Sequence, residues 1–405
     1  MTERLYYTDP TCLEFEASIV GIAQEEGRTL VRLDRTAFYP TSGGQPTDTG
    51  RLDEARVVDV LDREEAVVHV VEAPAETLGI GARVLGRIDG ERRRDHMQQH
   101  TGQHVLSAAF VRLHDVPTVS FHLGSSTSTV DLAREVSGDA IEAAEEAASR
   151  VVWENRPVSV RFASEDEAVS LPLRKPSQRA GTLRLIDISD WDLSACGGTH
   201  VARTGEIGAI VVCDWERYKS GTRITFVCGR RALRRHRELR DAVSRASALL
   251  SVAPADVDTA VEKLVADARD LRKATRTLSQ ELSAMRAAAL AERAEHVAGV
   301  ELLVALLEGA DAAALRTAAA SLTAAPGRVV VLLTEARPAA IVVARSADAA
   351  GVDASALLRH LVDRFGGKGG GKRELAQGGG IDADRDAVAA EVARILTTVA
   401  RGPFD

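Results

Sequence analysis

One stretch of the chain, residues 231–295, constrains the architecture more than any other. It contains a single proline, Pro254, and is dominated by alanine, arginine, leucine and glutamate. Beyond Pro254, spacings of four and three residues connect an almost wholly apolar row, formed by Val257, Val261, Leu264, Ala268, Leu271, Thr275, Leu278, Leu282, Met285 and Ala289. Thr275 interrupts this heptad pattern once. Such a row predicts a coiled-coil or helical-hairpin arm that divides the chain.

The sequence on either side of the arm predicts a multidomain α+β protein. Residues 1–90 contain short alternating strands separated by turn residues, which favours a small β-barrel. Residues 91–230 mix strands with helical periodicity that begins near Arg92, and a second helix is expected over residues 137–155. After the arm at 231–295, residues 296–405 return to β/α alternation and predict a small α/β domain.

Composition and charge narrow the class of protein. Hydrophobic residues make up 45% and charged residues 27% of the 405-residue chain, as in a soluble folded protein. The four cysteines are irregularly spaced, and the N-terminal MTERLYYTDP lacks the apolar core of a signal peptide. No run approaches the ~18 apolar residues of a membrane span. We therefore expect a cytoplasmic protein without a membrane partner. A net charge of −8 argues against indiscriminate binding to phosphate backbones. The arginine clusters at 92–94 and 230–237 are either local basic patches or solvated helix faces.

A metal site is suggested by histidines at four-residue intervals. The stretch DHMQQHTGQHVLSAAF carries His96, His100 and His104, and residues four apart on a helix share one face. Such a pair alone is weak evidence, but ACGGTHV adds Cys196 and His200 at the same spacing in a glycine-rich turn. Imidazoles and a thiolate together form a tetrahedral donor set that suits zinc.

The role of such a zinc ion stays undecided on these residues. Four protein ligands usually indicate a structural site, because catalytic zinc keeps an open position. The HExxH pattern is absent as well, since Thr101 stands where its general base would be. No catalytic base is assigned.

Five segments resemble one family. HMQQHTGQHVLSAAF and SACGGTHVARTGEIGAI are similar to the editing domain shared by alanyl-tRNA synthetases and the free-standing AlaX trans-editing proteins. TAFYPTSGGQPTDTG (36–50) resembles the family's glycine motif, and GTRITFVCGRRAL (221–233) resembles the end of its editing domain. GGKGGGKRELAQGGG (366–380) resembles the glycine-rich segment of the C-terminal domain, with Lys372 and Arg373 where the family usually has Arg-Pro.

The resemblance implies a metal centre and an activity. One zinc ion would be held by His100, His104, Cys196 and His200, with His96 outside the set. The order of segments is that of the long AlaX form, whose members remove serine, and often glycine, from mischarged alanine tRNA. No class II aminoacylation half precedes the barrel, so we expect no tRNA charging. Two alternatives stay open, namely a tRNA-binding adaptor with structural zinc and a hydrolase for another amino acid such as threonine.

The resemblance also implies substrate contacts near the zinc. A polar residue on the strand after the histidine helix should read the serine hydroxyl. In VSFHLGSST this residue is His122, with Ser120 as the alternative if the alignment slips. Gly43 and Gly44 either admit the 3′ end of the tRNA or form a tight hairpin turn.

The C-terminal region is expected to contact the body of alanine tRNA. The glycines of residues 366–380 would let phosphates approach backbone amides, and Lys368, Lys372 and Arg373 would add positive charge. A flexible linker is the neutral alternative. The arm either separates the two tRNA contacts or pairs with a second chain. A homodimer would form through this arm or, as the alternative, through the C-terminal domain.

Overall fold

The computed structural model describes residues 1–63, 66–175 and 181–400. The chain forms two compact units, Met1–Pro254 and Ala255–Asp405. Each unit contains helices and sheets, so the predicted multidomain α+β organisation is confirmed. Within the described ranges, no helix is both long enough and apolar enough to cross a bilayer.

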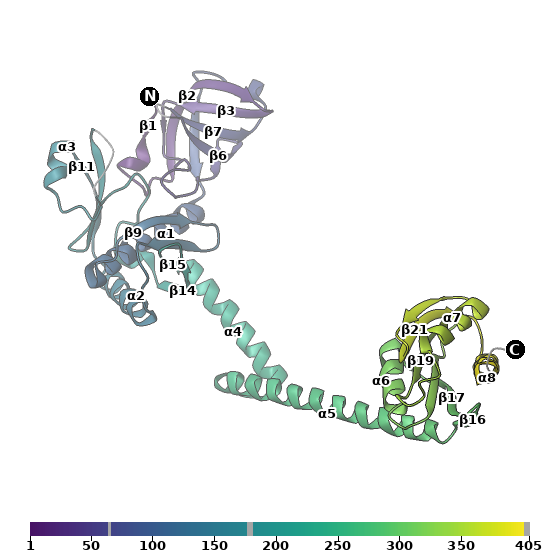
Figure 1. Ribbon diagram of the computed structural model, residues 1–405. Coiled ribbons are helices and arrows are strands. Elements are labelled where there is room, and N and C mark those ends of the chain that lie inside the picture. Colours follow the sequence, from purple (N-terminus) through teal and green to yellow (C-terminus); the bar gives the residue numbers. More distant parts are fainter. Residues whose placement is uncertain (64–65, 176–180, 401–405) are drawn as a thin grey trace. The chain divides into compact units, whose positions relative to one another are not determined.

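A barrel opens the first unit, where the strand pattern predicted one. Its six strands close in the order β2-β3-β7-β6-β5-β8 (Figure 1). The elements are β1 (Glu3–Arg4), η1 (Leu5–Tyr7), β2 (Glu14–Glu25), β3 (Arg28–Leu33), β4 (Arg35–Thr36), β5 (Gly50–Leu52), β6 (Ala55–Arg63), β7 (Ala66–Glu72), η2 (Ala75–Thr77) and β8 (Arg83–Ile88). Phe15 and Ile19 alternate with more exposed neighbours, as strand periodicity requires, and together with Val31 they fill the interior.

An α+β domain follows the barrel within the same unit. A four-stranded sheet has the order β14-β15-β10-β9, and a three-stranded sheet has the order β11-β12-β13. The elements are α1 (Gly90–His114), β9 (Thr118–Leu123), β10 (Ser128–Leu132), α2 (Gly138–Trp153), β11 (Val158–Ala163), α3 (Glu165–Ser170), β12 (Leu183–Ile188), β13 (Asp192–Ala195), η3 (Thr204–Ile207), β14 (Ile210–Tyr218) and β15 (Gly221–Cys228). Helices α1 and α2 confirm the two helices expected here.

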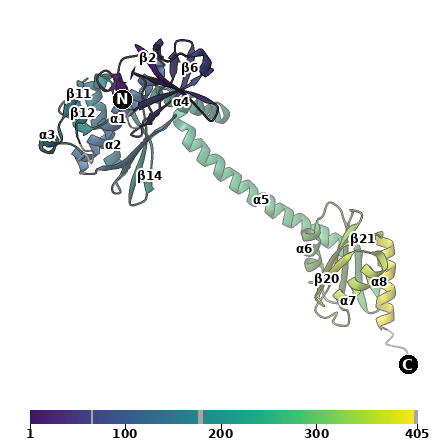
Figure 2. The same ribbon diagram turned by 90° about the horizontal axis from the view of Figure 1, so that it is seen from above.

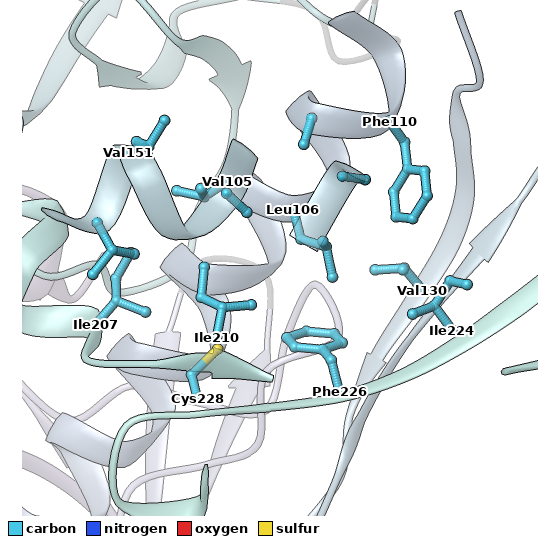
Figure 3. Packing of buried hydrophobic residues seen from close by; sticks show 14 of the residues in the cluster. Val105, Leu106, Phe110, Val130, Val151, Ile207, Ile210, Ile224, Phe226 and Cys228 are labelled. Atoms are coloured by element: carbon cyan, nitrogen blue, oxygen red, sulfur yellow. The ribbon is translucent and has the colours of Figure 1, made fainter. Parts of the chain in front are cut away.

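The core of this domain lies between α1, α2 and the four-stranded sheet. Leu106 and Phe110 of α1 pack against Ile224 and Phe226 of β15 (Figure 3). Each fully buried side chain of this size contributes about 1.5–3 kcal/mol to folding. A Cβ atom at Gly102 would lie 2.2 Å from the sulfur of Cys228, so only glycine lets α1 approach β15 this closely.

Helix α1 also anchors the barrel. It begins at the N-cap Asp89, whose side chain accepts hydrogen bonds from the backbone of Glu91 and Arg92. One turn further on, Arg93 is 1% exposed and its Nη2 donates to Asp48 Oδ2 at 2.6 Å. The same guanidinium donates to the carbonyl of Ala37. The solvated-face interpretation of the cluster at 92–94 therefore does not hold for Arg93, which is buried and joins the barrel to α1.

The predicted arm is helical, and its two helices belong to different units. Helix α4 (Arg230–Leu250) ends the first unit, and α5 (Val257–Ala291) opens the second after η4 (Pro254–Asp256). The apolar row of α5 is exposed, with Leu264, Leu271 and Leu278 showing 57%, 68% and 64% of their surface. A coiled coil through this row stays a prediction.

The second unit contains a six-stranded sheet of order β16-β17-β18-β19-β21-β20 (Figure 2). Helix α6 packs on one face, and α7 and α8 pack on the other. The elements are β16 (Glu295–Val297), β17 (Val300–Leu307), α6 (Ala312–Leu322), β18 (Arg328–Thr334), β19 (Ala339–Arg345), α7 (Ala354–Phe365), β20 (Lys368–Gly371), β21 (Leu375–Ile381) and α8 (Arg385–Ala400).

The glycine-rich segment of this unit is a pair of strands, not a linker. Strands β20 and β21 pair antiparallel, with Lys368 opposite Gly379 and Gly371 opposite Ala376. A Cβ atom at Gly371 would lie 2.4 Å from the Cα atom of Ala376, so the close pairing requires glycine there.

Candidate metal centre

The structure brings four of the predicted ligand residues together. His100 and His104 lie one turn apart on α1, and Cys196 and His200 lie in the loop after β13. Their candidate ligand atoms, one per residue, all lie within 4.8 Å of one another. The Sγ atom of Cys196 is 3.3 Å from Nε2 of His100 and 3.4 Å from Nε2 of His200.

These separations fit a single tetrahedral ion. Two donors bound to one zinc at ordinary bond lengths stand about 3.5 Å apart. The donor set is three imidazole nitrogens and one thiol sulfur, which is the chemistry zinc prefers in proteins. The residues present therefore fit the zinc ion that the sequence predicts.

Each histidine of the cluster has a second partner that orients its ring. Nδ1 of His100 lies 2.8 Å from Gln45 Oε1, and Nδ1 of His104 lies 3.0 Å from Asp192 Oδ2. Nδ1 of His200 lies 3.1 Å from the hydroxyl of Thr101, so the Nε2 atom of each ring is left for an ion. Such outer partners are typical of protein metal sites, where they fix ring orientation and tautomer.

Charges around the cluster favour the ligand form of the cysteine. Burial opposes ionisation of the Cys196 thiol, but the adjacent His100 and His200 outweigh it and hold its pKa well below the ordinary value. Burial, reinforced by His100, lowers the pKa of His200 to about 3. A thiolate and a neutral imidazole are the forms that bind zinc.

The carboxylate behind His104 is also held ionised. Burial works against the charge of Asp192, but His104 and Arg174 outweigh it and lower the pKa of this carboxyl to about 2. Nε of Arg174 donates to Asp192 Oδ1 at 2.7 Å. Asp192 can therefore accept a hydrogen bond from a protonated Nδ1 of His104 at neutral pH.

The second glycine of the ACGGTH loop, Gly198, is explained by the crowding around His100. A Cβ atom at Gly198 would lie 2.2 Å from Cε1 of His100. Any side chain at this position would displace the imidazole from the cluster. The carbonyls of Cys196 and Gly198 both accept hydrogen bonds from Arg184 Nη1, which holds the loop in place.

His96, the third histidine of the series, lies outside the cluster. It is buried, and its Nδ1 has no hydrogen-bond partner in the part of the chain that the structure describes. Burial, with Arg92 nearby, lowers its pKa to about 4. The four-residue spacing alone therefore did not separate ligands from a buried neighbour.

The predicted hydroxyl reader on β9 does not contact the cluster. His122 is exposed, and Ser120 donates its hydroxyl to Asp131 on the neighbouring strand β10. Phe121 lies between them, and its ring centroid is 5.6 Å from that of His100. Because successive side chains alternate between the faces of a strand, His122 points to the face opposite Phe121.

The two glycines of the barrel motif form a tight turn. Gly43 and Gly44 have φ values of 53° and 82°, and Ser42 and Gln45 pair across them. A Cβ atom at Gly44 would lie 2.8 Å from the ring of Phe121. The close approach that requires glycine here is to Phe121, which agrees with the hairpin-turn interpretation.

Several polar residues around the cluster were missed by sequence reasoning. Gln45, Thr101 and Asp192 contact the histidine rings, but none of them is one of the histidines or the cysteine that the HxxxH and CxxxH spacings single out. Gln103, three residues after His100, is 1% exposed and its amide donates to Ser107. Its Oε1 has no hydrogen-bond partner among the described residues. A buried oxygen without a partner among the described residues was not detectable from a single sequence.

The residues predicted to bind tRNA belong to the second unit. Lys368, Lys372 and Arg373 are exposed on the β20–β21 pair. Arg373 has an ion pair with Asp353 at 3.3 Å. They contribute nothing to the metal cluster, which lies wholly in the first unit.

Family models match along most of this architecture. The model for "tRNA synthetases class II (A)" matches residues 8–92, which include the barrel. The model for "Threonyl and Alanyl tRNA synthetase second additional domain" matches residues 183–225, which include Cys196 and His200. The "DHHA1 domain" model matches residues 299–399 of the second unit. Fold and matches together define a protein built from tRNA-synthetase-related domains.

Similar proteins identify the family. The alanine–tRNA ligase of Pyrococcus furiosus is 35% identical over 390 residues, 93% of this chain and 42% of the ligase. That of Halorubrum lacusprofundi is 35% identical over 398 residues, again 42% of its length, so the chain spans less than half of these relatives. The alanyl-tRNA editing protein AlaX-L of Pyrococcus horikoshii is 31% identical over 386 residues, 93% of this chain and 94% of that protein. The chain belongs to the AlaX-L family of alanyl-tRNA editing proteins.

Proposed function

We propose that this chain is a trans-editing hydrolase that removes serine from mischarged alanine tRNA, and glycine as a second substrate, with one zinc ion in the candidate metal centre. The observation that carries the proposal is the group of three buried histidines, His100, His104 and His200, with the partly buried Cys196, in a chain that belongs to an alanyl-tRNA editing family. Such an enzyme would meet its substrate in the cytoplasm.

The reaction is the hydrolysis of the ester that joins the amino acid to the terminal ribose of the tRNA. Water attacks the ester carbon, and negative charge develops on the carbonyl oxygen. When bound, zinc would supply positive charge that orients the substrate or polarises the ester or a water molecule. Four protein ligands favour the orienting role, because they leave no open position.

Selection of serine over alanine requires a polar group in the pocket that hydrogen-bonds the serine hydroxyl. Alanine would leave this group without a partner. A site built to hydrogen-bond a hydroxyl rejects the analogue that lacks it. Gln103 offers a buried Oε1 without a partner among the described residues, on the side of α1 that carries His100. We therefore propose Gln103, in addition to His122, as a candidate for recognising the serine hydroxyl.

The same proposal extends to partners. Lys368, Lys372 and Arg373 would contact the phosphates of alanine tRNA from the exposed β20–β21 pair. The exposed apolar row of α5 would pair with α5 of a second chain, since a row of exposed leucines at heptad spacing is typical of a helix with a partner.

Deacylation of defined substrates tests the proposed activity. Purified chain is mixed with alanine tRNA that carries serine, glycine, threonine or alanine. Rapid release of serine, with alanine retained, is expected. Binding of alanine tRNA without release of any amino acid would instead make the chain an adaptor. Preferential release of threonine would make it a hydrolase for a different mischarged amino acid.

Two variants separate the candidates for the hydroxyl reader. If Gln103 reads the hydroxyl, Gln103→Leu lowers the ratio of serine to alanine release by about 10-fold or more, because a lost hydrogen bond to substrate costs this much discrimination. The exposed His122 then behaves as a matched control, and His122→Ala keeps the ratio of the unmodified chain. The reverse pattern would assign the role to His122.

A further inference from the structure

Gln45 of the barrel lies against the metal cluster and is 0% exposed. Its Oε1 accepts hydrogen bonds from the backbone N–H of Thr199 at 3.0 Å and from Nδ1 of His100 at 2.8 Å. Its Nε2 donates to the hydroxyl of Thr199 at 2.8 Å. One barrel side chain therefore contacts both the α1 half and the ACGGTH half of the cluster.

This geometry fixes which nitrogen of His100 carries the proton. A backbone N–H can only donate, so the Gln45 atom that faces Thr199 N must be the carbonyl oxygen. The same oxygen faces Nδ1 of His100, so Nδ1 must be the protonated nitrogen. The lone pair of the ring is then on Nε2, which is the atom 3.3 Å from the sulfur of Cys196.

The loop that presents Gln45 is held in place at three points. The turn over Gly43 and Gly44 sets its backbone, and Gln45 N donates to the carbonyl of Ser42 at 2.9 Å. The carbonyl of Gly44 accepts from the backbone of Leu123 on β9 at 3.2 Å. Three residues beyond Gln45, Asp48 is ion-paired with Arg93 of α1.

The two contacts with α1 act together. Arg93 and His100 are seven residues apart, which is two helical turns and hence one face of the helix. The loop therefore runs along α1, with Asp48 at one turn and Gln45 at the metal-facing turn. A rigid support of this kind keeps a ring in one orientation before any ion arrives.

We propose that Gln45 is a positioning residue of the metal centre, through which the barrel's glycine motif holds His100 with Nε2 directed at the ion. The inference rests on the proposed zinc centre and gives the two glycines a different role from admission of the tRNA 3′ end. The barrel then contributes to metal affinity without contributing a ligand.

Two substitutions of Gln45 test the inference in the full chain. Gln45→Leu keeps the approximate volume but removes the acceptor, whereas Gln45→Glu keeps an oxygen that accepts from His100 and Thr199. Tyr39→Phe is the matched control, because it removes a hydrogen bond to Ser42 in the same loop without touching His100. Zinc affinity is measured by competition with a chromophoric chelator, and Co²⁺ absorption reports the coordination geometry.

Gln45→Leu should weaken zinc binding about 10–100-fold, the usual cost of losing an outer partner of a ligand. Gln45→Glu and Tyr39→Phe should stay within a few-fold of the unmodified chain. Melting temperatures of the metal-free forms show whether each variant is folded, and the increase on adding zinc should shrink in Gln45→Leu alone. Unchanged affinity in Gln45→Leu, or equal losses in the Leu and Glu variants, would overturn the inference. Failure of the unmodified chain to bind zinc would overturn the proposed metal centre as well.

Discussion

Helices α1 and α5 both carry residues at regular spacing, but the two patterns end in opposite environments. His100 and His104 of α1 are 0% and 3% exposed and are surrounded by partners from the barrel and from the loop after β13. Leu271 and Leu278 of α5 are 68% and 64% exposed in the single chain. The same kind of helical repeat thus marks a completed site in one helix and an unpaired surface in the other.

The difference follows from what each side chain needs. A buried imidazole is costly unless both nitrogens have partners, so the fold must bring Gln45 and Asp192 to α1. An exposed leucine costs a helix little by itself and stabilises an assembly only when it is covered. The α1 pattern therefore predicts its partners within the chain, and the α5 pattern predicts a partner outside it.

The largest effect is expected from removal of a ligand residue of the metal cluster that α1 helps to form. Cys196→Ala deletes the thiolate, so zinc affinity should fall more than about 100-fold, beyond the 10–100-fold typical of outer partners. Serine release should fall to the level of uncatalysed hydrolysis. Metal content by mass spectrometry and a deacylation assay measure the two. Cys213→Ala, which changes a partly buried cysteine of β14 outside the cluster, should bind zinc normally. Normal zinc content in Cys196→Ala would exclude this cluster as the metal centre.

A smaller effect is expected on the α5 side. In a dimer that buries the apolar row, Leu271→Glu removes two buried leucines, worth about 1.5–3 kcal/mol each, so the dissociation constant should rise roughly 100-fold or more. Sedimentation velocity over a range of concentrations measures it. Thr277→Glu adds the same charge to an exposed residue outside the row and should leave the dimer intact. A chain that sediments as a monomer at every concentration would remove the predicted partner.

The smallest effect concerns His96, which shares the spacing of the ligands but not their partners. His96→Gln should leave zinc content unchanged, because His96 is outside the cluster. Its pKa of about 4 in the folded chain lies below the ordinary value of 6.5, mainly through burial. The folded state thus disfavours the charged form, and stability is lost as the pH falls from 6.5 towards 4.

This acid sensitivity can be measured for the first unit alone. The three tryptophans, Trp153, Trp191 and Trp215, all lie in that unit, so their fluorescence follows its unfolding in urea. Between pH 7 and pH 5, His96 should cost the unmodified chain roughly 2 kcal/mol that His96→Gln retains. Equal losses in both chains would show that His96 is not held neutral by the fold.

Local patterns in the sequence predicted helices and strands, but they did not predict contacts between residues that are far apart in the chain. Helical periodicity predicted α1 and the pairing of His100 with His104, because both depend on residues four apart. The support of His100 by Gln45 depends on a contact across 55 residues, which no spacing encodes. On β9, a shift of one residue exchanges the two faces of the strand, and Phe121 contacts His100 where His122 was expected to lie. Glycines are rare in strands, so β20 was not foreseen.

The most direct test of the central claim is zinc add-back to the metal-free full chain, with bound zinc and serine release measured on the same samples. Release of serine from mischarged alanine tRNA should rise with bound zinc and reach its maximum at one ion per chain, while alanine stays attached to its tRNA. Full release by the metal-free chain, or no release with one zinc bound, would contradict the claim.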